Sequence, residues 1–533
     1  GGNSWTVAPI PGFNSTDPAG SAFQRYSDPW VSIAPNGTVY VSALALSLSG
    51  GFPSTSAILV STSTNGGSTW SAPATLINTP VPPGTNPIDL LNDKESITAD
   101  PNDPSGQTAY VVWDRLNQPS DSENFNAFHG FAFRGDALFA KTIDGGAHWS
   151  TNVVFAPQAN QQSIGHQLVV LPDANHTLVD SFTLMNGSGN QPAKAGQNSL
   201  AILRSTDHGA TWSDPIIGPT IQTLEVSDPD TGAPVRAGET LADFAADPSN
   251  GNLYLVWCDG RFSKFKHNDI AFSMSTNGGL TWTDPIKVNQ ARTDIPDGNQ
   301  QAFLPSVAVA ANHTVAVTYY DFRNHTAAAG LTTDYWLVHA DPGSDPVTNL
   351  TNPANWGGDE KRLTSEADGV TGKPFNLENA AFTSRGYFLG DYEGLAAAGN
   401  SFYALFAQAG TGSSDPSNMF FRDPPPAATE AASSSPAAPA SPSGPAADST
   451  PALDQAVAAL TPAPAGPAAS PALSAPAAVS TSSDSSAAST AAPTNLAALP
   501  TASAITARAR DRLFAGWGEN GPGDVLGENP AAA

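Results

Sequence analysis

An eight-residue motif that occurs four times is the feature that most limits what this chain can fold into. Each copy has Ser or Thr first, Asp or Asn third, Gly fifth, Thr or His seventh and Trp eighth, at residues 63–70, 142–149, 205–212 and 275–282. The copies recur at intervals of roughly 60 to 80 residues, about the length of one small antiparallel sheet with its loops. The sequence therefore predicts the blades of a β-propeller.

The chemistry of the motif is that of a turn. Each copy follows an apolar run such as Ala57-Ile58-Leu59-Val60, so it is expected to join two strands of a hairpin. The Asp or Asn side chain can accept hydrogen bonds from backbone N–H groups of the turn, Gly allows a positive φ, and Trp packs beneath the hairpin. Four copies on four hairpins indicate a structural and not a catalytic role.

The motif resembles the Asp box of sialidases and other BNR-repeat propellers, for example Ser205-Thr206-Asp207-His208-Gly209-Ala210-Thr211-Trp212. The resemblance covers residues 20–423 as architecture and implies a sialidase-like, all-β propeller. It does not by itself imply an activity, because one fold hosts many functions.

A second repeat sets the number of blades. A pair of strand-like segments precedes each Asp box, and two more pairs follow the last one: 30–33 with 38–43, 96–99 with 109–113, 167–170 with 177–181, 241–245 with 253–257, 306–310 with 315–320, and 392–396 with 402–406. Six pairs predict six blades. The outermost strand of the sixth blade is expected from the N-terminus, where Trp5-Thr6-Val7 alternates suitably, which closes the ring.

Composition divides the chain into three parts. Residues 1–423 are expected to form the propeller. Residues 424–506 are almost entirely Ala, Pro, Ser and Thr, without any Phe, Trp or Tyr, and such a segment cannot bury enough apolar surface to offset its chain entropy. It is predicted to be a disordered linker, followed by a short C-terminal segment of unknown role at 507–533.

Charge and cysteine content exclude several classes of function. The net charge of −26 comes from scattered acidic residues, whereas nucleic acids and anionic membranes attract clustered Lys and Arg. With Cys258 as the single cysteine there is no disulfide framework and no thiolate metal site. No apolar run is long enough for a transmembrane segment. No motif requires a cofactor or a metal, although the many loop Asp residues leave calcium binding open.

In a propeller, the loops before each first strand and after each second strand lie on one rim, and this rim is unusually charged here. The Asp boxes are expected at the opposite end of the blades. Before the first strands stand Arg25, Asp28, Asp93, Lys94, Glu95, His166, Glu239, Asp243, Asp391, Tyr392 and Glu393. Three second strands end in an Asp and an Arg, namely Asp114-Arg115, Asp259-Gly260-Arg261 and Asp321-Phe322-Arg323. Converging Arg forks bind a carboxylate. The alternative is that each Asp–Arg pair only braces its own loop.

The resemblance to sialidases assigns roles on this rim. The family uses three Arg, a Tyr nucleophile paired with Glu, and an Asp acid/base. Gly390-Asp391-Tyr392-Glu393 resembles the segment that carries the Tyr, and Gly238-Glu239 resembles the segment that carries its Glu. The first blade differs, because its nearest Arg is Arg25 and no Asp occurs between Asp28 and Asp89. Asp28 or Glu95 could then serve as the acid.

Two functions are compatible with these residues. The first is a sialidase-like exo-glycoside hydrolase that acts on an acidic sugar of a glycan, with catalytic residues Tyr392, Glu239, Asp28 and Glu95 and substrate-binding residues Arg25, Arg115, Arg261, Arg323, Asp391 and Glu393. The second is a non-catalytic propeller that binds a glycan or a protein and is tethered to a surface. Both imply an extracellular or cell-surface location.

Overall fold

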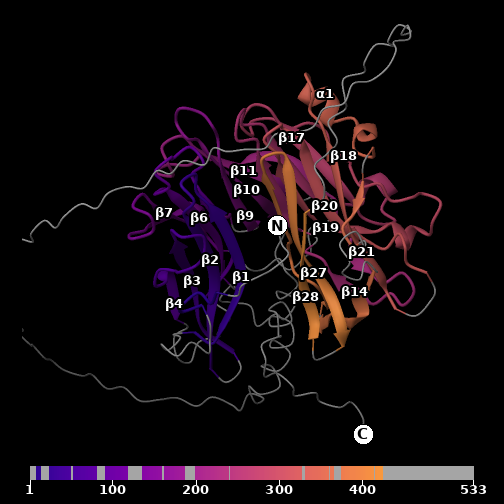
Figure 1. Ribbon diagram of the computed structural model, residues 1–533, viewed down its shortest axis with the longest axis horizontal. Helices are drawn as coiled ribbons and strands as arrows, with labels where there is room; N and C mark the ends of the chain where they lie inside the picture. Colours follow the sequence, from indigo (N-terminus) through magenta and orange to yellow (C-terminus); the bar gives the residue numbers. More distant parts are fainter. Residues whose placement is uncertain are drawn as a thin grey trace, which may run out of the picture. The chain divides into compact units, whose positions relative to one another are not determined.

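The computed structural model describes residues 8–13, 23–49, 52–80, 90–117, 135–158, 161–186, 198–238, 240–326, 330–358, 360–364, 374–383, 385–412 and 415–423 (Figure 1). The predicted linker, the C-terminal segment and the expected closing strand at Trp5–Val7 lie outside these residues. None of the helices in the described part of the chain is both long and apolar enough to cross a membrane.

Antiparallel sheets follow one another along the described chain, and most have four strands in sequence order. The first three sheets consist of β1 (Arg25–Ile33), β2 (Val39–Ser49), β3 (Phe52–Ser63), β4 (Ala74–Pro80), β5 (Leu90–Ala99), β6 (Ala109–Asn117), β7 (Ala137–Thr142), β8 (Ser150–Phe155), β9 (Gln161–Val170), β10 (Leu178–Asn186), β11 (Asn198–Ser205) and β12 (Ile216–Ile221). The next three consist of β15 (Ala242–Ala246), β16 (Leu253–Asp259), β17 (Asp269–Ser275), β18 (Ile286–Lys287), β19 (Ala302–Val309), β20 (Val315–Asp321), β21 (Thr332–Ala340), β22 (Lys361–Arg362), β23 (Phe375–Asn376), β26 (Gly394–Ala398), β27 (Ser401–Gly412) and β28 (Asp415–Arg422).

A small additional sheet joins two segments that are far apart in the sequence. It contains β13 (Val226–Ser227), β14 (Pro234–Arg236), β24 (Ala381–Thr383) and β25 (Gly386–Phe388). Here β14 runs parallel to β25, with Arg236 opposite Phe388. The short helices are η2 (Arg261–Ser263), η3 (Asp297–Gln300), α1 (Pro346–Leu350), η4 (Pro353–Asn355) and η5 (Leu377–Asn379). The additional sheet brings the chain ahead of β15 next to the chain ahead of β26.

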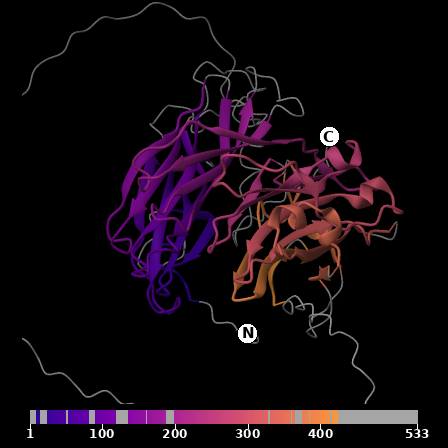
Figure 2. The same ribbon diagram turned by 90° about the horizontal axis from the view of Figure 1, so that it is seen from above.

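The predicted strand pairs are confirmed. The six pairs are β1 with β2, β5 with β6, β9 with β10, β15 with β16, β19 with β20 and β26 with β27. The first strand of each sheet also contacts the first strand of the next, from β1 through to β26. Figure 2 shows the sheets succeeding one another in sequence order. This arrangement is a β-propeller, as predicted, and the closing of the ring by Trp5–Val7 stays a prediction.

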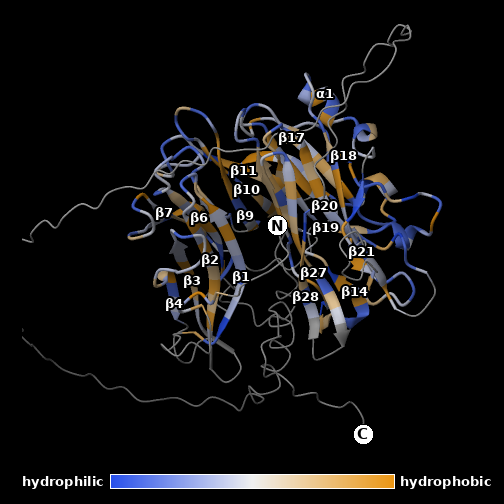
Figure 3. Ribbon diagram, viewed as in Figure 1, coloured by the Kyte–Doolittle hydropathy of each residue, from blue (hydrophilic) through white to orange (hydrophobic). Residues whose placement is uncertain are grey.

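Apolar side chains from neighbouring sheets fill the space between them. Tyr110 and Val112 of β6, for example, pack with Leu178 of β10 and Leu203 of β11. The strands are accordingly apolar along much of their length, whereas the loops at their ends are polar (Figure 3). Burial of this kind drives each sheet against its neighbour, which leaves the strand ends free to carry polar residues.

The Asp boxes form the predicted turns. In the third box, Asp207 Oδ1 accepts from the Thr211 N–H at 2.9 Å, and Ser205 Oγ accepts from the Gly209 N–H at 2.8 Å. Asn65 and Asn277 accept from the residue four positions later in the same way. Gly209 has a φ of 84°, and a Cβ there would lie 2.4 Å from Phe139 of the preceding sheet. This third box therefore both closes a hairpin and packs against the neighbouring blade.

The position of the boxes is also confirmed. Val39, at the start of β2, pairs with Ile33 at the end of β1 and with Ser63 at the end of β3. The box that follows Ser63 thus lies at the end of the sheet where β1 finishes, away from the charged residues where β1 begins.

Candidate functional site

Bulges in the first strands form the framework of the site. Four first strands lose register with their partners at equivalent places, next to Asp28, Lys94, Gly165 and Leu304. Asp28, Lys94 and Leu304 have φ values of 54°, 53° and 51°, which are unfavourable for residues other than glycine. A bulge re-aims the side chains beside it, and backbone strain of this kind is concentrated at functional sites.

A cavity of about 30 Å³ lies where these bulged strands meet. It is lined by Trp30, Lys94, Glu95, Ser96, Gly165, His166, Gln167, Ala237, Gly238, Leu241, Ala242, Asp243, Leu304, Pro305, Asp391 and Tyr392. The volume is enough for one or two water molecules. The cavity is the place where residues of five sheets and of the chain after β14 come together.

A network of ion pairs holds one wall of the cavity. Lys94 Nζ lies 3.1 Å from Asp28 Oδ2 and 2.7 Å from Asp391 Oδ2. Arg236 donates to the same Asp391 carboxylate through Nε at 3.0 Å and through a second nitrogen at 2.5 Å. Although burial alone raises the pKa of Asp391, Lys94 and Arg236 outweigh it and hold that pKa well below its usual value. Asp391 is therefore ionised and bound to two cations.

Tyr392 stands beside this network. Its ring packs edge-on against Trp30, with centroids 5.7 Å apart, and Lys94 Nζ lies 5.3 Å from the ring centroid. Burial, followed by the Asp28 and Glu95 carboxylates, raises the pKa of Tyr392 well above its usual value. The hydroxyl is buried and forms no hydrogen bond of regular geometry among the described residues, although the Asp28 carboxylate is close enough to affect it.

Two carboxyl groups of the site have pKa values that are shifted in opposite directions. Glu95 is only 1% exposed, and neither of its carboxyl oxygens has a hydrogen-bond partner among the described residues. Burial and the nearby Asp28 raise the pKa of Glu95 well above its usual value. Burial also acts to raise the pKa of Asp28, but Lys94 and the Ser27 hydroxyl outweigh it and lower that pKa. Glu95 thus keeps its proton to a higher pH than Asp28 does.

His166 forms a second buried group that lines the cavity. Its Nδ1 lies 2.6 Å from Asp180 Oδ2, its Nε2 lies 3.7 Å from Asp114 Oδ1, and its ring stacks on Phe182 at 4.3 Å. Burial lowers the pKa of His166, but Asp180 and Asp114 outweigh it and raise the value. Burial raises the pKa of Asp114 to about 7. The two ring nitrogens of His166 thus face Asp180 and Asp114.

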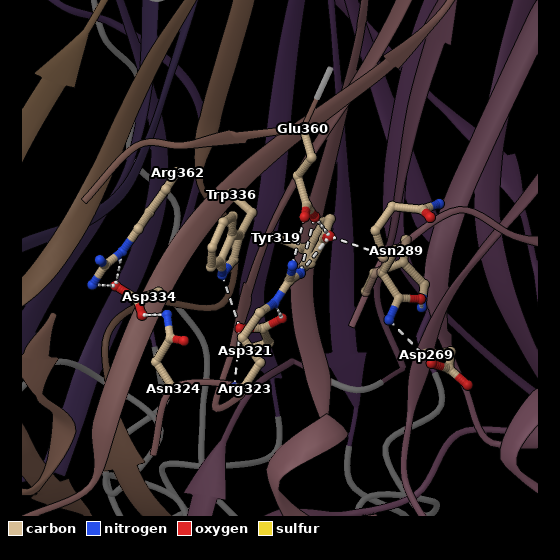
Figure 4. A network of polar contacts seen from close by, with 12 residues as sticks. Asp269, Asn289, Tyr319, Asp321, Arg323, Asn324, Asp334, Trp336, Glu360 and Arg362 are labelled. Carbon is tan, nitrogen blue, oxygen red and sulfur yellow. Dashed lines mark hydrogen bonds and ion pairs between the residues drawn. The ribbon is translucent and has the colours of Figure 1, made fainter. Parts of the chain in front are cut away.

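Arg261 and Arg323 each bind residues of neighbouring strands and loops, and Figure 4 shows the contacts of Arg323. Arg323 contacts Asp321, donates to Glu360 at 2.9 Å, and lies 3.9 Å above the Trp336 ring. Arg261 binds Asp259 through two nitrogens, both at 2.8 Å, and also donates to the carbonyl of Thr220. Neither arginine lines the cavity. For these two arginines the geometry favours the alternative in which an Asp–Arg pair braces its own loop.

Three other residues predicted to bind substrate lie outside the cavity lining. Arg115 lies on β6 opposite Asn92, and Arg25 opens β1 opposite Leu46, so both are away from the cavity lining. Glu393 accepts from the Tyr320 hydroxyl at 2.9 Å and from the Ala407 N–H at 3.1 Å. It is engaged with the core of the fifth and sixth sheets.

Of the four residues predicted to be catalytic, the structure brings three together. Glu95 and Tyr392 line the cavity, and Asp28 lies next to Tyr392 and Lys94, although the three residues belong to different sheets or their leading loops. Glu239 lies outside the described residues, and its predicted role remains a prediction.

Sequence reasoning missed the two cations of the site. Lys94 was visible as a rim residue, and its position between Asp93 and Glu95 is a usable signal, since a lone Lys among carboxylates is expected to bind one of them. Arg236 gave no signal, because the additional sheet that carries it does not belong to the repeat. Among the described residues, no group of three or more His, Cys, Asp or Glu is arranged to hold a metal ion.

Comparisons with known proteins add structural neighbours only. No family model matches the chain, and no curated protein matches it. Among solved structures it is similar to the Hadza microbial sialidase Hz136, with 14% identity and a TM-score of 0.42 over 72% of this chain, and it spans only 63% of that protein. It is also similar to an α-L-arabinanase of Penicillium chrysogenum, with 11% identity and a TM-score of 0.40 over 79% of this chain and 99% of that one. A Trypanosoma rangeli sialidase has 12% identity and a TM-score of 0.39, over 78% of this chain and 57% of that protein. The chemistry of the site therefore has to be argued from its own residues.

Proposed function

We propose that the protein is a glycoside hydrolase in which Glu95 is the general acid, Tyr392 the nucleophile and Asp28 the base for Tyr392. The observation that carries the proposal is that two carboxyl groups with pKa values shifted in opposite directions, that of Glu95 upward and that of Asp28 downward, lie beside the buried Tyr392 hydroxyl. Environments that push two carboxyl pKa values apart are what acid/base hydrolysis of a glycoside requires.

The proposed reaction has two steps. First, Tyr392 attacks the anomeric carbon and loses its proton to Asp28, while Glu95 protonates the departing glycosidic oxygen. In the second step, ionised Glu95 takes a proton from water, the water oxygen bonds to the anomeric carbon, and the Tyr392 oxygen leaves and recovers its proton from Asp28. Lys94 then keeps Asp28 ionised between turnovers.

The small cavity sets a condition on this proposal. At about 30 Å³ it holds one or two waters and not a sugar ring. The sugar must therefore sit at the mouth, and side chains there must move for the anomeric carbon to reach Tyr392. The same observation favours the second candidate, a propeller that binds a glycan at its rim without cleaving it.

Substitutions at the three residues test the proposal. Glu95→Gln, Asp28→Asn and Tyr392→Phe are each expected to lower kcat/KM on aryl glycosides by about 10²- to 10⁴-fold, because each removes a proton-transfer or bond-forming group. Activated aryl leaving groups need little protonation, so Glu95→Gln should lose less activity on them than on alkyl glycosides.

The control is Asp207→Asn, in an Asp box remote from the cavity, since two natural boxes carry Asn at this position. Wild-type activity in the Tyr392→Phe and Glu95→Gln proteins would exclude the mechanism. Absence of turnover by the wild type on a broad glycoside panel, with glycan binding retained, would favour the non-catalytic alternative.

A further inference from the structure

We infer that the site selects neutral sugars and that Asp391 is the residue that excludes acidic ones. The inference rests on the proposed glycosidase function for the nature of the ligand. The sequence predicts an acidic sugar whose carboxylate is bound by Arg forks. The inference of a neutral sugar departs from that prediction.

Every cationic side chain at the cavity is already bound to a carboxylate. Lys94 Nζ lies 2.7 Å from Asp391 and 3.1 Å from Asp28. Arg236 is bound to Asp391 by two nitrogens, and its side chain is 4% exposed. His166 lies 2.6 Å from Asp180. The strongest donors near the reacting groups are therefore bound within the protein.

Asp391 itself holds the place where an incoming carboxylate would bind. Its two oxygens contact a guanidinium and an ammonium group at once, which is the usual recognition of a carboxylate by Arg and Lys. A substrate carboxylate would have to displace this buried side chain or remain unpaired beside it. Burying an unpaired charge costs several kcal/mol.

The remaining polar lining also repels anions. Asp243 lines the cavity, and the carboxylate of Asp28 is bound to Lys94. Like charges placed opposite one another are a common means of rejecting a wrong ligand. A neutral sugar meets no such penalty, and its hydroxyl groups can donate to these carboxylates.

The first experiment measures the charge preference of the wild-type protein. Hydrolysis is followed on pairs of 4-nitrophenyl glycosides that differ only by a carboxylate, glucoside against glucuronide and galactoside against galacturonide, together with an aryl sialoside. Neutral members are expected to be cleaved at least 100-fold faster. Faster cleavage of the acidic members would overturn the inference and leave the proposed glycosidase function intact.

The second experiment asks whether Asp391 causes the preference, without relying on turnover. Acetate, whose carboxylate can replace that of the Asp391 side chain, is titrated into wild type, Asp391→Ser and Asp391→Asn, and binding is followed by calorimetry at low salt. Asp391→Ser removes the internal carboxylate and should bind acetate at least 10-fold more tightly than wild type. The gain should disappear in the Asp391→Ser/Lys94→Met double variant.

Two controls separate this result from general effects. Asp297→Ser removes an exposed ion pair with Lys266, 2.9 Å long, and should leave acetate binding unchanged. Circular dichroism identifies any variant that does not fold. If Asp391→Ser does not fold, Asp391→Asn, which keeps the shape of the side chain, should still show a gain in acetate binding, smaller than that expected for Asp391→Ser. A folded Asp391→Ser protein with no gain in acetate binding would overturn the role of Asp391. If no glycoside is cleaved but acetate binding behaves as expected, the proposed function fails and the charge assignment stands.

Discussion

At the residue scale, Arg323 shows how a buried ion pair can resemble a binding site in sequence. Its charge, its rim position and its Asp neighbour are the features of a substrate-binding arginine. In the structure its side chain is only 7% exposed, bonded to Asp321 and Glu360 and stacked on Trp336. The pKa of Asp321 is nevertheless raised to about 7, because burial outweighs the effect of Arg323. These contacts assign Arg323 to stability.

We therefore predict that Arg323→Met destabilises the protein by about 3 kcal/mol, because it leaves Asp321 and Glu360 buried without a cation. The free energy of unfolding is measured by urea titration. Arg292→Met is the matched control, since its pair with Asp294 is exposed (67% and 69%), and no measurable change is expected. Loss of substrate affinity in Arg323→Met without loss of stability would contradict the structural role.

At the element scale, the first three sheets each contain an Asp-box turn and a first-strand bulge, and the two features have different roles. The turn satisfies its own backbone, as in the bonds from the Gly209 and Thr211 N–H groups to Ser205 and Asp207. The bulge does the opposite, since it breaks the strand register and holds residues such as Lys94 at a positive φ. The stabilising turns therefore lie at one end of these blades, and the polar site lies at the other end.

For the turn, Ser205→Ala is expected to cost about 1–2 kcal/mol, because it leaves the buried Gly209 N–H without an acceptor. Asp207→Asn should be tolerated, since Asn277 accepts the equivalent bond in its own box. Asp207→Ala should lower the thermal midpoint. Activity per folded molecule should not change in any of the three, and a loss of activity in them would contradict the separation of the two ends.

At the scale of the whole molecule, buried acids control how stability depends on pH. Burial raises the pKa of Glu393 to about 8, of Asp114 to about 7, and of Asp93 and Asp243 to about 6. Their unfolded values are near 4, so the folded protein binds more protons than the unfolded chain between pH 4 and 8. Stability from these groups is complete below pH 4 and is lost as pH rises to 8.

Carboxylates with lowered pKa values determine how the stability of the protein changes at acid pH. The pKa of Asp103 is lowered to about 2, because hydrogen bonds from Ser105 and Thr108 outweigh burial, and Lys94 and Arg236 lower that of Asp391. Stability from this group is lost as pH falls below 4. The thermal midpoint should therefore be highest near pH 5 and fall towards pH 8. Glu393→Gln should flatten the alkaline side, and an unchanged slope in that variant would contradict the assignment.

Much of the fold could be predicted from the sequence, because its signals are local. Asp207 and Ser205 identify a turn through residues four positions away, and the strand pairs such as Leu253–Trp257 after Leu241–Ala245 are neighbours in the chain. Part of the site could also be predicted, since Asp28, Glu95 and Tyr392 all stand at the start of first strands. The additional sheet with Arg236 could not, because its parallel pairing to β25 has no repeat.

The blades, their turns and the charged rim follow from the order of residues along the chain, since each depends on short-range hydrogen bonds and strand periodicity. Which charges bind one another depends on how the folded chain brings them together. Lys94 and Asp391 are 297 residues apart and lie 2.7 Å from each other, whereas Arg261 binds Asp259 two residues away. Ion pairs depend on distance in space and on burial, and neither is encoded in the spacing of residues along the chain.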